Sequence, residues 1–455
     1  MSKLVKSSRS LLDLVPGGCH TYSKGPDQFS SNTPATIDRG EGARVLGCDG
    51  RWYIDWGMGL TAVSIGHGFR PVCDAVSRVI AEGTNFIRPG TLEIEAAERF
   101  LSVFGGDMVK FCKNGSVATT AAVKLSRGYT NRRKVAIPFE HPFFSYDDWF
   151  IGATPADSGI LDEAKQHTLR FHYNDLASLE ALFAEHGNDI ACVMLEPVKV
   201  DAPKPGFLEG IRDLCQRHGS VFILDETITG LKWSIRGGQG YFNIEADLHI
   251  WGKGIANGFS CCALAGKREI MSLGGSQPTG RRMFLVSTTH GAESGGLAAM
   301  LATVDAFLAT DMIGDNWRRG QALMDGITRV TASHGLQDVF GISGYPCLPV
   351  FGWRGLPEAR MLEWKTLFMQ ELVNEGQLCQ GPMLLTVSHD DAVISQTIAA
   401  FDAALGRVRQ AWDTGSVRGF LVGPAIQPVF RSRQECVKSR CGRLHAGEDK
   451  EPCCE

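Results

Sequence analysis

Two short apolar runs in this chain each end next to a residue that can do chemistry. Val221–Leu224 is followed at once by Asp225, and Leu248–Trp251 is followed by Lys253 with a glycine on either side. A desolvated lysine amine can attack a carbonyl and then carry a proton, and a buried carboxylate can keep an aromatic ring nitrogen protonated. Pyridoxal phosphate (PLP) needs these two groups at its aldehyde and at its pyridine nitrogen. The pair therefore predicts PLP chemistry, with Lys253 and Asp225 as the catalytic residues.

A third segment has the form of a phosphate site. Asn114 is followed by Gly115, Ser116 and Val117, and then by a run of small residues typical of a helix. The free backbone N–H groups at a helix start bind anions, and the serine hydroxyl adds a donor. The alternative interpretation, an ordinary serine cap, is common in proteins, but a phosphate cradle agrees better with the aspartate and the lysine.

Further polar and aromatic residues are expected around the cofactor. Glu196 follows the apolar run 190–195 and is expected to lie beside the site rather than to act in catalysis. The aromatic stretch 141–149 offers His141 or Phe143 to stack on a planar ring, and the sequence does not choose between them. Ordinary alternatives are a turn aspartate at 225 and a solvated lysine at 253.

Composition excludes several classes of partner. The 455 residues carry 46 basic and 50 acidic side chains, a net charge of -4 that offers no general attraction to nucleic acid or to an anionic membrane. We find no apolar run of about 18 residues and no secretory signal, and we expect a cytoplasmic protein. Most of the 14 cysteines are scattered and fit a reducing compartment. Those of the polar tail match no paired zinc spacing, and no metal is expected.

The order of the elements predicts an α/β fold. A hairpin is expected over 43–55, helices over 71–82, 92–104 and 207–218, and strands over 189–196, 221–225 and 248–251. Strand, helix, strand in this order implies a mainly parallel sheet, whose ligands bind beyond the carboxyl ends of the strands. Longer helices are expected over 295–309 and 390–412.

The chain is predicted to divide into four parts. Residues 1–60 form an N-terminal segment that contributes to a small domain, and residues 61–316 form a large PLP-binding domain. Residues 317–430 complete the small α+β domain, and residues 431–455 form a flexible tail that contains cysteines.

Together these motifs resemble the class III (omega) aminotransferases of PLP fold type I, and most of all the subgroup of glutamate-1-semialdehyde aminomutase. The resemblance runs from about Pro16 to Val408 and includes an N-terminal Pro-Gly-Gly, the hairpin, the phosphate loop, Leu-Glu-Pro, Asp-Glu and Gly-Lys-Gly. It implies that Lys253 forms the Schiff base and that Asp225 pairs with the pyridinium. It further implies that Thr289 reaches the phosphate in the neighbouring subunit of a homodimer whose active sites are shared.

The chain departs from the family pattern at several positions. The Tyr-His-Gly motif of the family appears as Glu140-His141-Pro142, and Val117 replaces an acidic residue. The aminomutase arginine that binds the substrate carboxylate aligns with Lys24, which lacks the bidentate fork. His20, Tyr22 and Arg88 are expected near the same pocket.

The resemblance implies transfer of an amino group from an amino donor to an aldehyde or ketone acceptor in two half-reactions, with a sugar or natural-product aldehyde as the suggested acceptor. The alternatives are an intramolecular aminomutase of the glutamate-1-semialdehyde type, a racemase or epimerase, and a catalytically silent PLP-binding protein.

Overall fold

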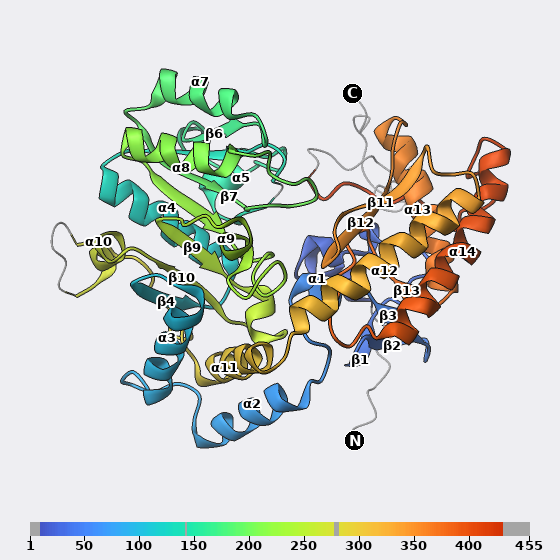
Figure 1. Ribbon diagram of the computed structural model, residues 1–455, viewed down its shortest axis with the longest axis horizontal. Coiled ribbons are helices and arrows are strands. Elements are labelled where there is room, and N and C mark those ends of the chain that lie inside the picture. Colours follow the sequence, from blue (N-terminus) through green and yellow to red (C-terminus); the bar gives the residue numbers. More distant parts are fainter. Residues whose placement is uncertain (1–9, 142, 277–281, 431–455) are drawn as a thin grey trace, which may run out of the picture.

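The computed structural model describes residues 10–141, 143–276 and 282–430. It shows a large and a small part side by side, each built on its own sheet (Figure 1). The expected tail at 431–455 and Pro142 of the Glu-His-Pro motif lie outside the described residues.

The large part contains a seven-stranded sheet in the order β4-β10-β9-β8-β7-β5-β6. Its strands are β4 (Met108–Cys112), β5 (Lys134–Pro138), β6 (Thr168–Phe171), β7 (Ile190–Leu195), β8 (Val221–Asp225), β9 (Leu248–Trp251) and β10 (Cys262–Gly266). β10 runs antiparallel to both of its neighbours, and the pairs from β9 to β6 are parallel. The central strands β7 and β8 are buried throughout and apolar up to Asp225, because helices cover both faces of the sheet.

Alternate side chains of the strands pack on opposite layers of helices. On one face, α4 (Gly115–Thr130) presents small residues such as Ala118 and Ala122 to the sheet. On the other face lie α7 (Leu176–His186) and α8 (Phe207–His218), with α2 (Arg70–Glu82), α3 (Thr91–Phe104) and α11 (Ser294–Ala309) toward the β4 edge. The small residues on α4 let this helix lie close to the strands, so its N-terminus comes near the strand ends.

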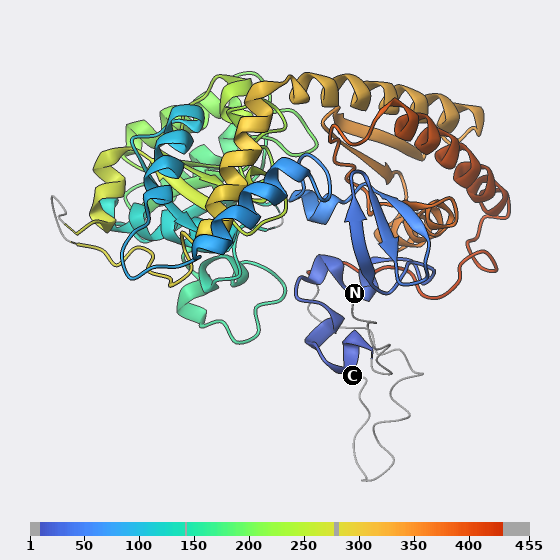
Figure 2. The same ribbon diagram turned by 90° about the horizontal axis from the view of Figure 1, so that it is seen from below.

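The small part has a separate core. A four-stranded sheet has the order β1 (Ile37–Glu41), β2 (Arg44–Gly47), β3 (Trp52–Asp55) and β13 (Gln377–Leu378), and a hairpin pairs β11 (Phe340–Tyr345) with β12 (Leu348–Trp353). The helices α12 (Met312–Ser333), α13 (Glu358–Asn374) and α14 (Asp391–Asp413) pack on them around a cluster rich in phenylalanine and tryptophan. Helix α12 follows α11 and runs from the large part along the small one (Figure 2).

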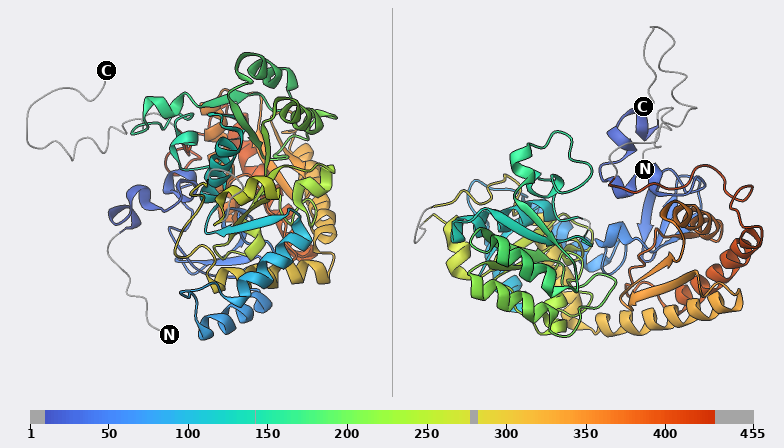
Figure 3. Two further views of the ribbon diagram at one scale, coloured as in Figure 1. Left: turned by 90° about the vertical axis from the view of Figure 1, so that its left-hand side faces the viewer. Right: turned by 90° about the horizontal axis from the view of Figure 1, so that it is seen from above.

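Short helices complete the described fold. The four-residue to six-residue helices are α1 (Met58–Thr61), α5 (Asp148–Ile151), α6 (Asp162–Lys165), α9 (Gly237–Phe242) and α10 (Arg268–Met271). The 3-10 turns are η1 (Leu11–Asp13), η2 (Pro16–Gly18), η3 (Tyr22–Lys24), η4 (Pro26–Gln28), η5 (Lys253–Ala256) and η6 (Ser272–Gly274). The η1–η4 segment and the α5–α6 segment project from the same side of the molecule (Figures 2 and 3).

The predicted α/β fold with a mainly parallel sheet is confirmed. The expected hairpin, the strands β7, β8 and β9, and the helices α2, α3, α8, α11 and α14 all form within one or two residues of their predicted bounds. In the described part of the chain, no single helix is long and apolar enough to cross a membrane. Only α11 and α12 taken together meet that test, and they are bent by 74° at their junction.

Candidate active site

The two predicted catalytic residues and the predicted neighbour Glu196 lie at one edge of the large sheet. β7, β8 and β9 are mutually parallel neighbours, so their carboxyl ends meet. Glu196 directly follows β7, Asp225 is the last residue of β8, and Lys253 stands two residues after β9. The register of the sheet therefore brings a base, an acid and an amine together.

The backbone at Lys253 is held in an uncommon conformation. Its φ is +49°, in the left-handed region that side chains other than glycine rarely adopt. The glycines beside it allow close packing, because a Cβ on Gly252 would lie 2.6 Å from Cys262 Sγ and one on Gly254 would lie 3.1 Å from Ser64 Cβ. Lys253 Nζ donates no hydrogen bond to another described residue, which leaves the amine available.

A strained segment from the small part supports the lysine loop. All four residues of α1 have positive φ, including Leu60 at +60° and Thr61 at +68°. The chain that follows bonds the loop directly, since Ser64 Oγ donates to the carbonyl of Gly254 at 2.6 Å and Ile65 N donates to Asn257 Oδ1 at 2.9 Å. These bonds offset part of the cost of a left-handed turn, which is about 1–2 kcal/mol per residue.

Asp225 is a buried carboxylate whose negative charge is only partly offset by its neighbours. Its side chain is 6% exposed, and Oδ1 accepts a hydrogen bond from Thr227 N at 2.9 Å. Burial, followed by the nearby charge of Glu196, raises the pKa of Asp225 to about 6, against the opposing effects of Thr227 and Lys253. A cation placed at this carboxylate would restore its charged form, which is what a protonated ring nitrogen provides.

Glu196 and Lys199 form an ion pair beside this acid. Lys199 Nζ lies 3.1 Å from Glu196 Oε1, while Glu196 Oε2 is buried without a hydrogen-bond partner. Burial alone would raise the pKa of Glu196, but the charges of Lys199, His141 and Lys253 hold it below its ordinary value. For Lys253, burial lowers the pKa of the amine, Lys199 lowers it further, and the two acids oppose the shift.

His141 is a neutral buried ring. Its Nδ1 accepts the backbone N–H of Glu196 at 3.1 Å, and burial lowers its pKa to about 4. The proton therefore sits on Nε2, which is buried and has no partner. Phe143 is 49% exposed and packs edge-on against Phe150. Of the two stacking candidates, His141 is thus the one that lies next to Glu196.

The predicted phosphate loop lies at the start of α4. Asn114 caps the helix through Oδ1, which accepts from Val117 N at 3.0 Å, and Ser116 Oγ accepts from Tyr146 N at 3.3 Å. Thr227, just beyond β8, approaches this helix start, since a Cβ on Gly115 would lie 3.7 Å from Thr227 Oγ1. That hydroxyl is buried without a partner.

The arrangement fits PLP at both ends and in the middle. Three buried polar atoms at the strand ends, Thr227 Oγ1, His141 Nε2 and Glu196 Oε2, have no hydrogen-bond partner among residues 10–141, 143–276 and 282–430. Buried polar groups are normally paired, so their grouping here favours a polar ligand. The N-terminus of α4 suits a phosphate, Asp225 suits a cationic ring nitrogen, and Lys253 suits an aldehyde.

Other predicted site residues lie on the surface of the single chain. His20, Tyr22, Lys24, Arg88 and Thr289 are all exposed. No hydrogen bond or ion pair among the described residues joins them to Asp225 or Lys253. The carbonyl of Thr289 accepts instead from Asn85 Nδ2 at 3.0 Å. Their roles remain predictions, and only that of Thr289 was predicted to involve a neighbouring subunit.

Sequence reasoning did not single out three residues of this region. Lys199 pairs with Glu196, Thr227 faces the phosphate loop, and Lys232 is a second buried lysine whose pKa is lowered to about 7, first by burial and then by Lys253. Nζ of Lys232 lies 3.2 Å from where a Cβ of Gly254 would be. A signal existed for Lys199 and Thr227, since Lys199 closely follows Glu196 after β7 and Thr227 closely follows Asp225 at the end of β8.

Comparison with known proteins agrees with this geometry. The family model "Aminotransferase class-III" matches residues 27–345. The chain belongs to the class III aminotransferase family. It is 32% identical over 425 residues to glutamate-1-semialdehyde 2,1-aminomutase 2 of Geobacillus kaustophilus (strain HTA426), covering 87% of this chain and 96% of that one. A Bacillus cereus (strain ATCC 10987 / NRS 248) protein of the same name is 29% identical, covering 90% and 99%.

Solved structures show the same fold. The FumI protein of Sphingopyxis sp. MTA144, with PLP, matches this class III chain with a TM-score of 0.81 at 22% identity, over 89% of this chain and 96% of that one. An omega-transaminase of Sphaerobacter thermophilus gives 0.79 at 24% identity, over 88% and 96%. A glutamate-1-semialdehyde-aminomutase of Pseudomonas aeruginosa PAO1 gives 0.75 at 22%, over 86% and 91%. The protein is a class III enzyme that uses PLP, as its lysine and aspartate predicted.

Proposed function

We propose that this enzyme moves an amino group from an amino donor to an aldehyde or ketone acceptor in two half-reactions. The observation that carries the proposal is the amine of Lys253, which donates no hydrogen bond to another described residue and lies at the same sheet edge as Asp225 and near the start of α4. PLP, when bound, supplies an aldehyde that condenses with amino groups and a ring that accepts electrons.

The residues of the chain have separate tasks in this proposal. Lys253 would hold the cofactor through its amine and would serve as the group that accepts and donates a proton at the reacting carbon, for which its lowered pKa suits it. Asp225 holds the ring nitrogen in its protonated form. The N–H groups at Gly115 and Ser116, with the hydroxyls of Ser116 and Thr227, bind the phosphate.

A second function has a specific observation in its favour. The curated relatives that cover 87–90% of the chain are named glutamate-1-semialdehyde 2,1-aminomutases. An intramolecular aminomutase would use the same residues but keep the intermediate carbonyl compound bound until the amino group returns to it. The exposed Lys24, where that subgroup has arginine, removes the bidentate contact to a carboxylate and favours the transferase.

The proposal includes a homodimer with shared active sites. The η1–η4 and α5–α6 segments project from the molecule (Figure 3). Apolar side chains on them are exposed, among them Leu14 at 54%, Tyr22 at 71% and Leu161 at 67%. Apolar surface on segments that project from one side is typical of an interface. In such a dimer the exposed Thr289 of one subunit would bind the phosphate held by the other, as the family resemblance implies.

One assay separates the candidates. The enzyme loaded with PLP is mixed with single amino donors, and the visible absorbance of the cofactor reports its conversion to the amine form. A transferase converts with a donor alone, releases a carbonyl product, and reverts on addition of an aldehyde acceptor. An aminomutase isomerises glutamate 1-semialdehyde without added acceptor. A protein that binds PLP but converts with no donor and isomerises nothing would refute both.

A further inference from the structure

Lys199 occupies a special place among the cations of the site. It stands in the loop after β7, with its side chain 32% exposed, whereas the side chain of Glu196, its partner, is only 5% exposed. The ammonium can donate three hydrogen bonds, and Glu196 Oε1 is the acceptor found for it among the described residues. Lys199 therefore has unused donors and a route to solvent.

The positive charge of Lys199 shifts the pKa values of several groups in the reaction centre. It lowers the pKa of Lys253 and of His141, and it is the strongest charge that lowers the pKa of Glu196. Asp225 and His141 are almost fully buried, so neither side chain is open to a molecule that arrives from solvent. Lys199, with its side chain 32% exposed and its Nζ 3.1 Å from Glu196, is the cation at this sheet edge that is open to solvent. Since β7, β8 and β9 are parallel neighbours, Lys199 and the amine of Lys253 follow strands that end at the same edge.

Other basic side chains are less suited to meet that molecule. Lys232 is 4% exposed, donates to the carbonyl of Gly230, and has a pKa lowered to about 7, so much of it is neutral at physiological pH. Lys24 and Arg88 are exposed and have no contact with the centre within the described single chain.

We propose that Lys199 is a specificity residue, which binds a carboxylate on the amino compound that reacts at Lys253. The inference rests on the proposed function and names its substrate class. At rest Glu196 holds the ammonium in place. An arriving carboxylate takes the unused donors and shares the cation with Glu196, whose second oxygen remains inside the centre. The long lysine chain can make this small movement without a change in the backbone.

The experiment compares acids with their neutral primary amides. Alanine, β-alanine and 4-aminobutanoate, each beside its amide, are offered as donors to the enzyme loaded with PLP, and kcat/KM of the half-reaction is measured for wild type and Lys199→Met. The acid-to-amide ratio of at least one pair is expected to fall about 10- to 100-fold, the range of a charged hydrogen bond. Lys199→Arg should keep most of the ratio.

Two controls separate recognition from structure. Lys204→Met removes a charge from the same loop, at an exposed lysine that donates to the carbonyl of Asn174 at 3.1 Å, and should leave every ratio unchanged. The double variant Glu196→Gln, Lys199→Met removes both partners of the ion pair, so no buried carboxylate is left unpaired. Its acid-to-amide ratio should still be lower than that of wild type. The inhibition constant of propanoate tests carboxylate binding by a molecule that does not react. It should rise in the single variant Lys199→Met and stay unchanged in Lys204→Met.

The outcomes are distinct. If Lys199→Met slows the acids and the amides equally, the residue only shields Glu196 and the inference is wrong. If wild type converts acids and amides equally well, no carboxylate is recognised there, although the transferase function stands. If wild type converts no donor, the proposed function fails, and the inference fails with it.

Discussion

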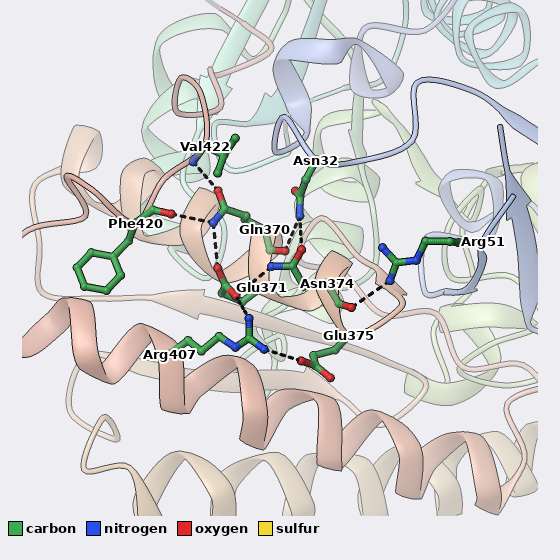
Figure 4. Close-up of polar contacts among 9 residues, drawn as sticks. All are labelled: Asn32, Arg51, Gln370, Glu371, Asn374, Glu375, Arg407, Phe420 and Val422. Atoms are coloured by element: carbon green, nitrogen blue, oxygen red, sulfur yellow. Dashed lines mark hydrogen bonds and ion pairs between the residues drawn. The ribbon is translucent and has the colours of Figure 1, made fainter. Parts of the chain in front are cut away.

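Two buried carboxylates in this molecule have opposite surroundings. Glu371 on α13 is 7% exposed, and both of its oxygens are satisfied, by Gln370 Nε2 at 2.9 Å, by Asn374 Nδ2 at 3.1 Å and by Arg407 at 3.2 Å (Figure 4). Glu196 in the large part is 4% exposed, yet one of its oxygens has no partner. The first carboxylate sits in a complete network and the second in an incomplete one.

The complete network joins distant pieces of the chain. Gln370 bonds the backbone of Phe420 and Val422 on one side, and Asn32 bonds its carbonyl on the other (Figure 4). It therefore fixes the N-terminal segment and the segment after α14 to α13. The network around Glu196 links this residue to His141 and Lys199, and it leaves polar atoms without a partner among the described residues. The difference separates polar groups that stabilise the fold from polar groups held ready for a ligand.

Removal of the amine of Lys253 should give the largest effect, because this amine is the group proposed to hold the cofactor and to carry the proton. We expect Lys253→Ala to lower turnover at least about 10,000-fold, as loss of a nucleophile does. Borohydride reduction followed by mass spectrometry should find the cofactor fixed to residue 253 in wild type and absent there in the variant. Near-wild-type turnover or an adduct on another lysine would refute the assignment, and circular dichroism checks that the variant folds.

Asp225→Asn should give the second largest effect. It should lower activity and raise the stability of the cofactor-free protein. We expect turnover to fall about 100- to 1,000-fold, the size of a lost electrostatic contact in a reaction centre. The unfolded chain releases this proton near pH 3.8 and the folded protein near 6, so the stability that Asp225 contributes is complete below 3.8 and lost as pH rises through 6.

The cofactor-free variant should therefore gain stability relative to wild type between pH 4 and 7. The gain is about 3 kcal/mol at ~1.4 kcal/mol per pKa unit, and urea denaturation at a series of pH values measures it. A constant difference across this range would show that Asp225 is not protonated in the folded, cofactor-free protein.

The contrast between the two networks also explains which features of the structure could be predicted from the sequence. Asp225 and Lys253 were predictable because apolar runs deliver them to a common sheet edge, which needs only strand order. The tautomer of His141 was not, because it depends on one hydrogen bond to a backbone N–H 55 residues away. Nor was the network of Glu371, since Arg407 and the 420–422 backbone meet α13 only through tertiary packing.

Disrupting the complete network should affect stability and not catalysis. We expect Glu371→Ala to destabilise the small part by about 3 kcal/mol, because Asn374 loses the acceptor of its amide and Gln370 loses one of two. Fluorescence of the small-part tryptophans, Trp353, Trp364 and Trp412, reports that core during urea denaturation. Turnover per folded molecule should stay within about twofold of wild type. A large loss of turnover would mean that this network also shapes the reaction centre.

The smallest effect is expected at the other end of the same ion pair. Arg407 is 55% exposed and reaches Glu371 and Glu375, so its charge is largely screened by solvent. Arg407→Met should therefore cost less than about 1 kcal/mol in the same measurement. If it costs as much as Glu371→Ala, the ion pair and not the buried hydrogen bonds supplies the stability.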